Sequence, residues 1–216
     1  MSNFFDFNYS FGPVDEESEL IPLMTSDDEE AILKEILPKS VPILPLRNAV
    51  LFPGVVIPIS ATRDKSVKLI KYANSKDKLI GVVSQKDSNV SDPSIGDINK
   101  IGTVAKILRV LQMPDGNLTI IIQGKKRFEI EKVISKKPFL TCSISELKEI
   151  NPSIGNKKFI ATIDSIKDLA LKIIDENPSI PSEASFAIKN IHSNSFLVNF
   201  VSSNMNISVN EKFKIL

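Results

Sequence analysis

Residues 101–134 constrain the fold more than any other part of the sequence. Two runs rich in β-branched residues lie on either side of the sequence MPDGN at positions 113–117. Pro114 presets the backbone for the first central position of a turn, and Gly116 accepts positive φ. Apolar runs flanking such a turn predict a β-hairpin. Gly124 interrupts the second run, which predicts a bulge or a tight bend.

Charge is distributed unevenly along the 216-residue chain. Residues 1–38 contain ten acidic side chains and one basic side chain, whereas the remainder contains 26 basic and 16 acidic ones. A segment with so many charges cannot bury enough apolar surface to fold. We therefore expect residues 1–38 to form a disordered leader. Alternatively, the aromatic side chains of the leader form a short docking motif; they are Phe4, Phe5, Phe7, Tyr9 and Phe11.

The sequence lacks the side chains of several common catalytic sites. Cys142 is the only cysteine, which excludes cysteine metal clusters and internal disulfides. His192, the only histidine, follows an apolar predicted helix and is expected to be a packing or surface residue. The single Gly-Lys pair, Gly124-Lys125, lacks the spacing of a phosphate-binding loop. We therefore expect no catalytic residue, no metal and no cofactor in this chain. The acidic N-terminus does not resemble a secretory signal, and no apolar run reaches the ~18 residues of a membrane helix.

The order of the other elements predicts an α+β fold. Proline-broken strands are expected within residues 41–60, and further strands near 79–84 and 139–144. From residue 159 onward, apolar positions repeat every three or four residues and predict four helices, the last opened by a capping box at Ser208. We place a β-rich domain at residues 39–150 and a helical subdomain at 151–216. The last helix has no stop signal, which suggests truncation at the C-terminus.

Several motifs, taken together, resemble the N-terminal domain of the Lon family of ATP-dependent proteases. They are LPLRNAVLFPGVVIPI at 44–59, RDKSVKLI at 63–70, IGTVAKILRVLQMPDGN at 101–117 and IIQGKKRFEI at 121–130, with residues 195–216 resembling the helical part that follows. The resemblance covers about residues 41–216. It implies a small β-barrel-like, PUA-like domain followed by a helical bundle.

The resemblance also implies a role. In this family the N-terminal domain selects unfolded or degron-bearing protein substrates and supports hexamer assembly in the cytoplasm. The whole enzyme degrades misfolded and regulatory proteins. ATP, Mg²⁺ and the catalytic serine and lysine belong to domains that this sequence does not contain. An alternative function is a PUA-like RNA-binding module that uses a basic patch formed by the run at residues 125–127 and by Lys136-Lys137. Few aromatic residues accompany that run, so nucleic acid is the less favoured partner.

The apolar loop within the first motif is the candidate substrate-binding element. Its candidate residues are Arg47, Val50, Leu51, Phe52, Pro53 and Val55. Two interpretations remain open for this loop. It closes the barrel and is buried, or part of it forms an exposed apolar patch that binds unfolded chains.

Overall fold

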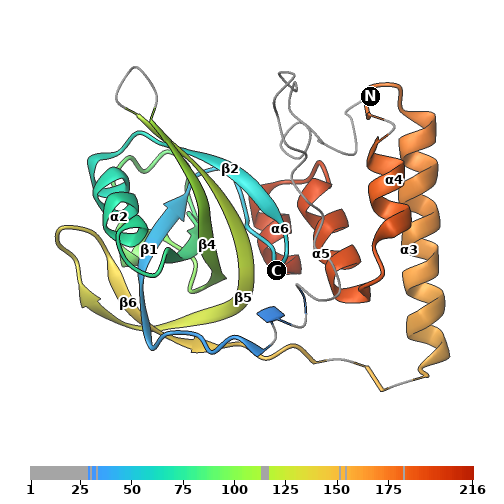
Figure 1. Ribbon diagram of the computed structural model, residues 1–216, viewed down its shortest axis with the longest axis horizontal. Coiled ribbons are helices and arrows are strands. Elements are labelled where there is room, and N and C mark those ends of the chain that lie inside the picture. The colour runs from blue at the N-terminus through green and yellow to red at the C-terminus, as the bar shows by residue number, and fades with distance from the viewer. Residues whose placement is uncertain are drawn as a thin grey trace.

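The computed structural model describes residues 29, 31–32, 34–112, 117–150, 152–153, 155–181 and 183–216. It has a mixed α+β fold in which the strands lie on one side and four of the helices on the other (Figure 1). The named elements are, in order, β1 (Ser40–Leu46), β2 (Val56–Ala61), α2 (Asp64–Asn74), β3 (Leu79–Ser84), η2 (Ile95–Asp97), β4 (Ile101–Gln112), β5 (Leu118–Ser135), β6 (Thr141–Glu146), α3 (Lys157–Glu176), α4 (Glu183–Asn190), α5 (Asn194–Asn204) and α6 (Val209–Ile215).

The six strands form one sheet in the order β2-β5-β4-β3-β1-β6. An additional pairing between β5 and β6 closes the hydrogen bonding into a ring. Only β1 and β3 are parallel, with α2 in the connection between β2 and β3. The 18-residue β5 is long enough to pair with β2, β4 and β6 along its length.

The predicted hairpin is confirmed as β4 and β5, which are antiparallel and pair up to Gln112 and Leu118. The four central turn residues, 113–116, lie outside the described residues. The predicted irregularity at Gly124 is also confirmed. Ala105 of β4 pairs with Gly124 of β5, but Thr103 pairs with Arg127, so the register shifts immediately after Gly124 along β5. A shift of this kind is a β-bulge, and it bends β5 at this point.

The four predicted helices of the second half are confirmed. Asn156 caps α3 by accepting a hydrogen bond from the Phe159 amide. At the other end, α3 stops at Glu176, immediately before Asn177-Pro178. The capping box of α6 has both of its reciprocal bonds, between Ser208 and Glu211.

Buried apolar side chains form two clusters. The larger one is continuous from the strands and α2 into α3, α4 and α5, so the sheet and the helices share a core. The smaller one is centred on Phe128 and includes Cys142. Residues 1–28 of the predicted leader lie outside the described residues, whereas Ile32 is described and buried.

Candidate functional site

The structure places most of the sequence-predicted site residues in the interior. Val50, Leu51, Phe52 and Val55 belong to the larger apolar cluster, and Pro53 is buried beside them. The interpretation of this loop as an exposed apolar patch is therefore wrong, and the buried alternative is correct. Arg47 is the exposed exception.

Specific contacts hold the loop inside. The Thr103 hydroxyl, itself fully buried, donates a hydrogen bond of 2.6 Å to the carbonyl of Leu51. The turn at Pro53-Gly54 lies directly on β5, where the Gly54 amide donates to the Gly124 carbonyl and the Gly124 amide to the Val55 carbonyl, both at 2.9 Å. A Cβ atom at Gly124 would lie 2.3 Å from the Phe52 carbonyl oxygen. Glycine is thus required at residue 124 by the close approach of this turn.

The basic run at residues 125–127 is engaged in contacts within the chain. Lys125 pairs with Glu35 at 3.3 Å, and Lys126 pairs with Glu146 at 3.0 Å. Lys126 also donates to the main-chain carbonyl of Glu35 at 2.7 Å. Carboxylates and carbonyl groups of the same chain therefore already bind the cations of this run, while nucleic-acid binding by the wider basic patch stays a prediction.

Arg127 joins the strands to the helices. Its Nη1 atom donates to Glu149 Oε1 at 2.5 Å, and its Nη2 donates to Asn199 Oδ1 at 2.7 Å. Its Nε donates to the carbonyl of Leu216 at 2.7 Å. Glu149 in turn accepts a hydrogen bond from Ser195 at 2.8 Å. Burial lowers the pKa of the Arg127 guanidinium, and the charge of Glu149 opposes this shift.

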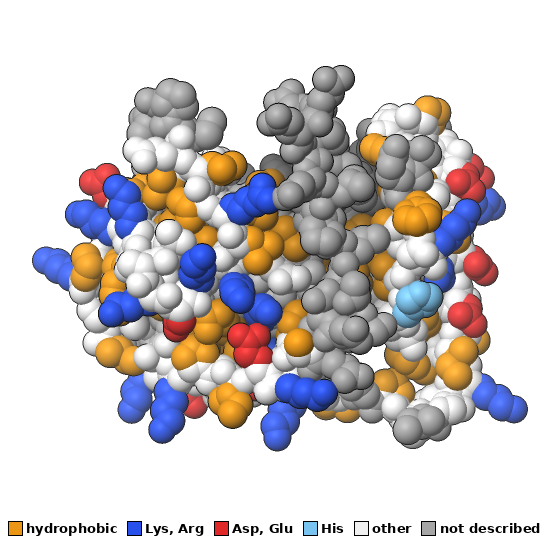
Figure 2. All heavy atoms as spheres, viewed as in Figure 1, with side chains coloured by type: hydrophobic (Ala, Val, Ile, Leu, Met, Phe, Trp, Pro, Cys, Tyr) orange, Lys and Arg blue, Asp and Glu red, His pale blue; other side chains and the backbone are white. Residues whose placement is uncertain are grey.

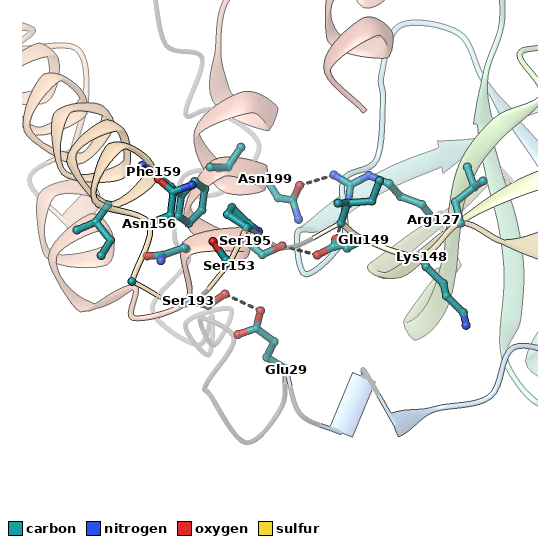
Figure 3. Close-up of a pocket in the computed structure, with 17 residues that line it drawn as sticks. Glu29, Arg127, Lys148, Glu149, Ser153, Asn156, Phe159, Ser193, Ser195 and Asn199 are labelled. Carbon is teal, nitrogen blue, oxygen red and sulfur yellow. Dashed lines mark hydrogen bonds and ion pairs between the residues drawn. The ribbon is translucent and has the colours of Figure 1, made fainter.

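A pocket of about 830 Å³, which we call the seam pocket, lies beside this network. It is lined by β5 through Arg127, by the connection after β6, and by the N-terminal ends of α3 and α5. Figure 3 shows Arg127 and Glu149 reaching into it from one side and Phe159 from the α3 side. Glu29 closes one edge, where the Ser193 hydroxyl donates to its carboxylate at 2.5 Å.

The seam pocket presents apolar side chains to solvent. Ile150 is 97% exposed and Ile160 is 47% exposed, and both line the pocket together with Phe159 and Val198. Exposed apolar side chains beside a polar rim are typical of surfaces that bind other proteins. The pocket can therefore accept apolar side chains of a partner, although most of its Ser and Asn side chains are already hydrogen-bonded within the chain.

The described residues provide little for catalysis. No group of three or more His, Cys, Asp or Glu side chains that could hold a metal ion occurs among them. Burial raises the pKa of the Cys142 thiol to about 11, and a protonated buried thiol is a poor nucleophile. None of the described helices has the length and the apolar character needed to cross a membrane.

These features define a binding domain built on a mixed α+β scaffold. A family model described as the substrate-binding domain of ATP-dependent protease La (LON) matches residues 40–216. The chain therefore belongs to the family of Lon substrate-binding domains.

Curated relatives and a solved structure agree with this assignment. The chain is 63% identical over 209 residues to the Lon protease of Flavobacterium johnsoniae and 48% identical over 201 residues to that of Cytophaga hutchinsonii. The matches cover 97% and 93% of this chain but 26% and 25% of those relatives, so it spans about a quarter of their length. The N-terminal domain of Mycobacterium avium complex Lon protease has a similar fold, with a TM-score of 0.65 at 21% identity over 82% of this chain and 88% of that one.

Sequence reasoning missed the seam pocket. The signal that could have found it is the apolar pattern of α3, where Ile160 lies at the edge of the stripe formed by Ile163, Ala170 and Ile174. A stripe broader than one packed face predicts that its edge residues stay accessible. The contacts of Arg127 carried no such local signal, because its partners are up to 89 residues away in sequence.

Proposed function

We propose that this chain is the substrate-recognition part of a Lon-type ATP-dependent serine protease that degrades misfolded and regulatory proteins in the cytoplasm. In this proposal the chain itself is not catalytic, and ATP and Mg²⁺ act elsewhere in the enzyme. Its partners are unfolded or degron-bearing proteins and, in a hexamer, other subunits. The proposal also takes the strands to form the barrel-like, PUA-like module that the resemblance implies, and the ring of paired strands supports this part of it.

The observation that carries the proposal is the exposed apolar lining of the seam pocket in a chain of this family. Ile150 and Ile160 face solvent although each would gain from burial. Fully burying an Ile side chain contributes about 1.5–3 kcal/mol, and Ile160 is already half-buried, so a partner at this residue gains about 1 kcal/mol. Such a modest gain at each anchor fits weak, sequence-tolerant binding of unfolded segments.

The test is the binding of a fluorescently labelled unfolded protein, such as carboxymethylated casein, followed by fluorescence anisotropy. We expect Ile160→Asp to weaken binding about fivefold, because it removes about 1 kcal/mol of apolar burial. Leu169→Asp is the matched control, since Leu169 is an exposed apolar residue of the same helix that does not line the pocket. Equal effects of the two substitutions would contradict the proposal.

Salt dependence separates this function from RNA binding. Apolar recognition changes little between 50 and 500 mM salt, whereas phosphate contacts lose affinity steeply. The same titration is therefore repeated with a single-stranded RNA. RNA affinity that exceeds casein affinity and falls steeply with salt would favour the RNA-binding alternative.

A further inference from the structure

A second hollow, which we call the basic cleft, lies where the segment between β1 and α2 meets the connection between α5 and α6. Its volume is about 630 Å³. Arg47, Arg63 and Lys212 line it, together with apolar side chains that include Val50 and Ile57. Arg63 donates a hydrogen bond to the Gln85 side chain at 2.8 Å and Lys212 donates one to the Ser203 carbonyl at 2.6 Å; both of these acceptors are uncharged. None of the described residues that line this cleft is an aspartate or a glutamate. The cleft therefore combines positive charge with an apolar floor.

The two arginines lie close enough to influence each other. Burial lowers the pKa of the Arg63 guanidinium, the positive charge of Arg47 lowers it further, and Asp92 acts in the opposite direction. The Asp92 carboxylate is bound to Lys65 at 2.5 Å. An anion placed between Arg47 and Arg63 would relieve their repulsion, as it does at other paired-cation sites.

We propose that the basic cleft binds the chain's own acidic leader, residues 1–28. That segment contains seven acidic side chains and no basic one. Phe4, Phe5, Phe7 and Tyr9 stand among polar residues and Asp6, so aromatic side chains and a carboxylate occur together. This composition complements a cleft that offers cations around an apolar floor.

The seam pocket is the weaker site for the same segment. Two carboxylates, Glu29 and Glu149, line it together with two cations, Arg127 and Lys148, and Arg127 is engaged with Glu149. The charged lining of the seam pocket is therefore balanced, whereas the described lining of the basic cleft holds three cations and no carboxylate. Charge therefore directs the leader to the basic cleft, and the inference holds whether or not the seam pocket binds substrates.

The leader is long enough to reach the cleft. The described chain starts at Glu29, which is anchored to Ser193. Phe11 precedes Glu29 by 18 residues, and an extended chain of that length spans up to about 60 Å. A compact protein of 216 residues is only about 45 Å across. Because the tether is covalent, even weak contacts are favoured by a high effective concentration.

The first test uses a labelled synthetic peptide of residues 1–28 and two proteins, the full chain and a variant that lacks residues 1–28. We expect the peptide to bind the shortened variant at least tenfold more tightly than the full chain, whose cleft is already filled. Arg47→Glu in the shortened variant should weaken binding about tenfold. Lys68→Glu, an equal charge change at an exposed residue of α2 outside the cleft, should have a much smaller effect.

Equal affinity of the peptide for the full chain and the shortened variant would overturn the proposal. Equal losses from the two charge reversals would also overturn it, because they would indicate non-specific attraction. Arg47 is exposed, so its substitution leaves the core intact. A concentration-dependent dimer that disappears when residues 1–28 are removed would assign the leader to the cleft of a second copy, and this result too would contradict the intramolecular proposal.

The second test locates the leader in the intact chain. Cys142 is buried, so a spin label on a Ser2→Cys variant reacts at residue 2 alone. We expect paramagnetic broadening of the amide signals of Asn48, Ser60 and Asn206, which line the basic cleft. Broadening of the Ile160 signal instead would place the leader in the seam pocket and refute the proposal.

Discussion

Replacing Phe52 tests directly whether the first motif acts as core or as a binding surface. Its side chain is fully buried in the cluster that joins the sheet to the helices. Phe→Ala at such a site costs about 3–5 kcal/mol, because transfer free energy is lost and a cavity remains. With a urea m-value of about 2–3 kcal/mol per M, the unfolding midpoint should fall by about 1–2 M.

The matched control is Phe186→Ala. Phe186 lies on α4 with 69% of its surface exposed, so the same change should alter stability by less than about 0.5 kcal/mol. Both variants are unfolded in urea and followed by far-UV circular dichroism, with casein binding measured at a temperature where each is folded. Retained binding by folded Phe52→Ala protein is the expected result.

A folded Phe52→Ala variant with a wild-type urea midpoint but lost casein binding would refute this reasoning. It would mean that Phe52 reaches the ligand in solution. A midpoint shift equal to that of Phe186→Ala would refute it as well, since the two residues differ mainly in burial.

Two further outcomes follow from the same packing. Gly124→Ala should lower the free energy of unfolding, measured in urea, by about 1–3 kcal/mol, because the new Cβ would lie 2.3 Å from the Phe52 carbonyl oxygen. Gly96→Ala is the control: its Cβ would have its nearest neighbour at 3.8 Å, so the change should be nearly neutral. Cys142 should resist iodoacetamide at pH 8, since a pKa of about 11 leaves a thiolate fraction on the order of 100-fold below that of a free thiol. Its alkylation should accelerate as pH rises toward 11 or as urea unfolds the chain; rapid labelling of the native protein at pH 8 would contradict the buried position.

Local signals in the sequence predicted most of the secondary structure. Helix ends were found because their stops and caps are made by neighbours, as at Asn177-Pro178 and at Ser208 with Glu211. The β4–β5 hairpin was found because alternation and turn residues both act within a few positions. The parallel pairing of β1 with β3 has no comparable local signal, since it depends on a crossover through β2 and α2.

The site was harder to predict for two physical reasons. An apolar run such as 49–56 has no polar alternation, so its sequence does not indicate whether the run is covered; the fold covers it with β5 and Thr103. The positive charges of residues 125–127 are paired with Glu35, Glu146 and Glu149, and all three glutamates lie far from this run in the sequence. Long-range pairing of this kind follows from the way β6, the segment after it and the segment before β1 lie against β5, which composition does not specify.

The seam pocket exists only while the strands and the helices are docked, because β5, the connection after β6, α3 and α5 each provide part of its wall. The hydrogen bonds of Arg127 to Glu149 and Asn199 favour this docked state. A ligand of the pocket binds the docked state alone, so its apparent affinity falls in proportion to the docked fraction. Binding and docking are therefore linked, and any ligand of the pocket would stabilise the interface that forms it.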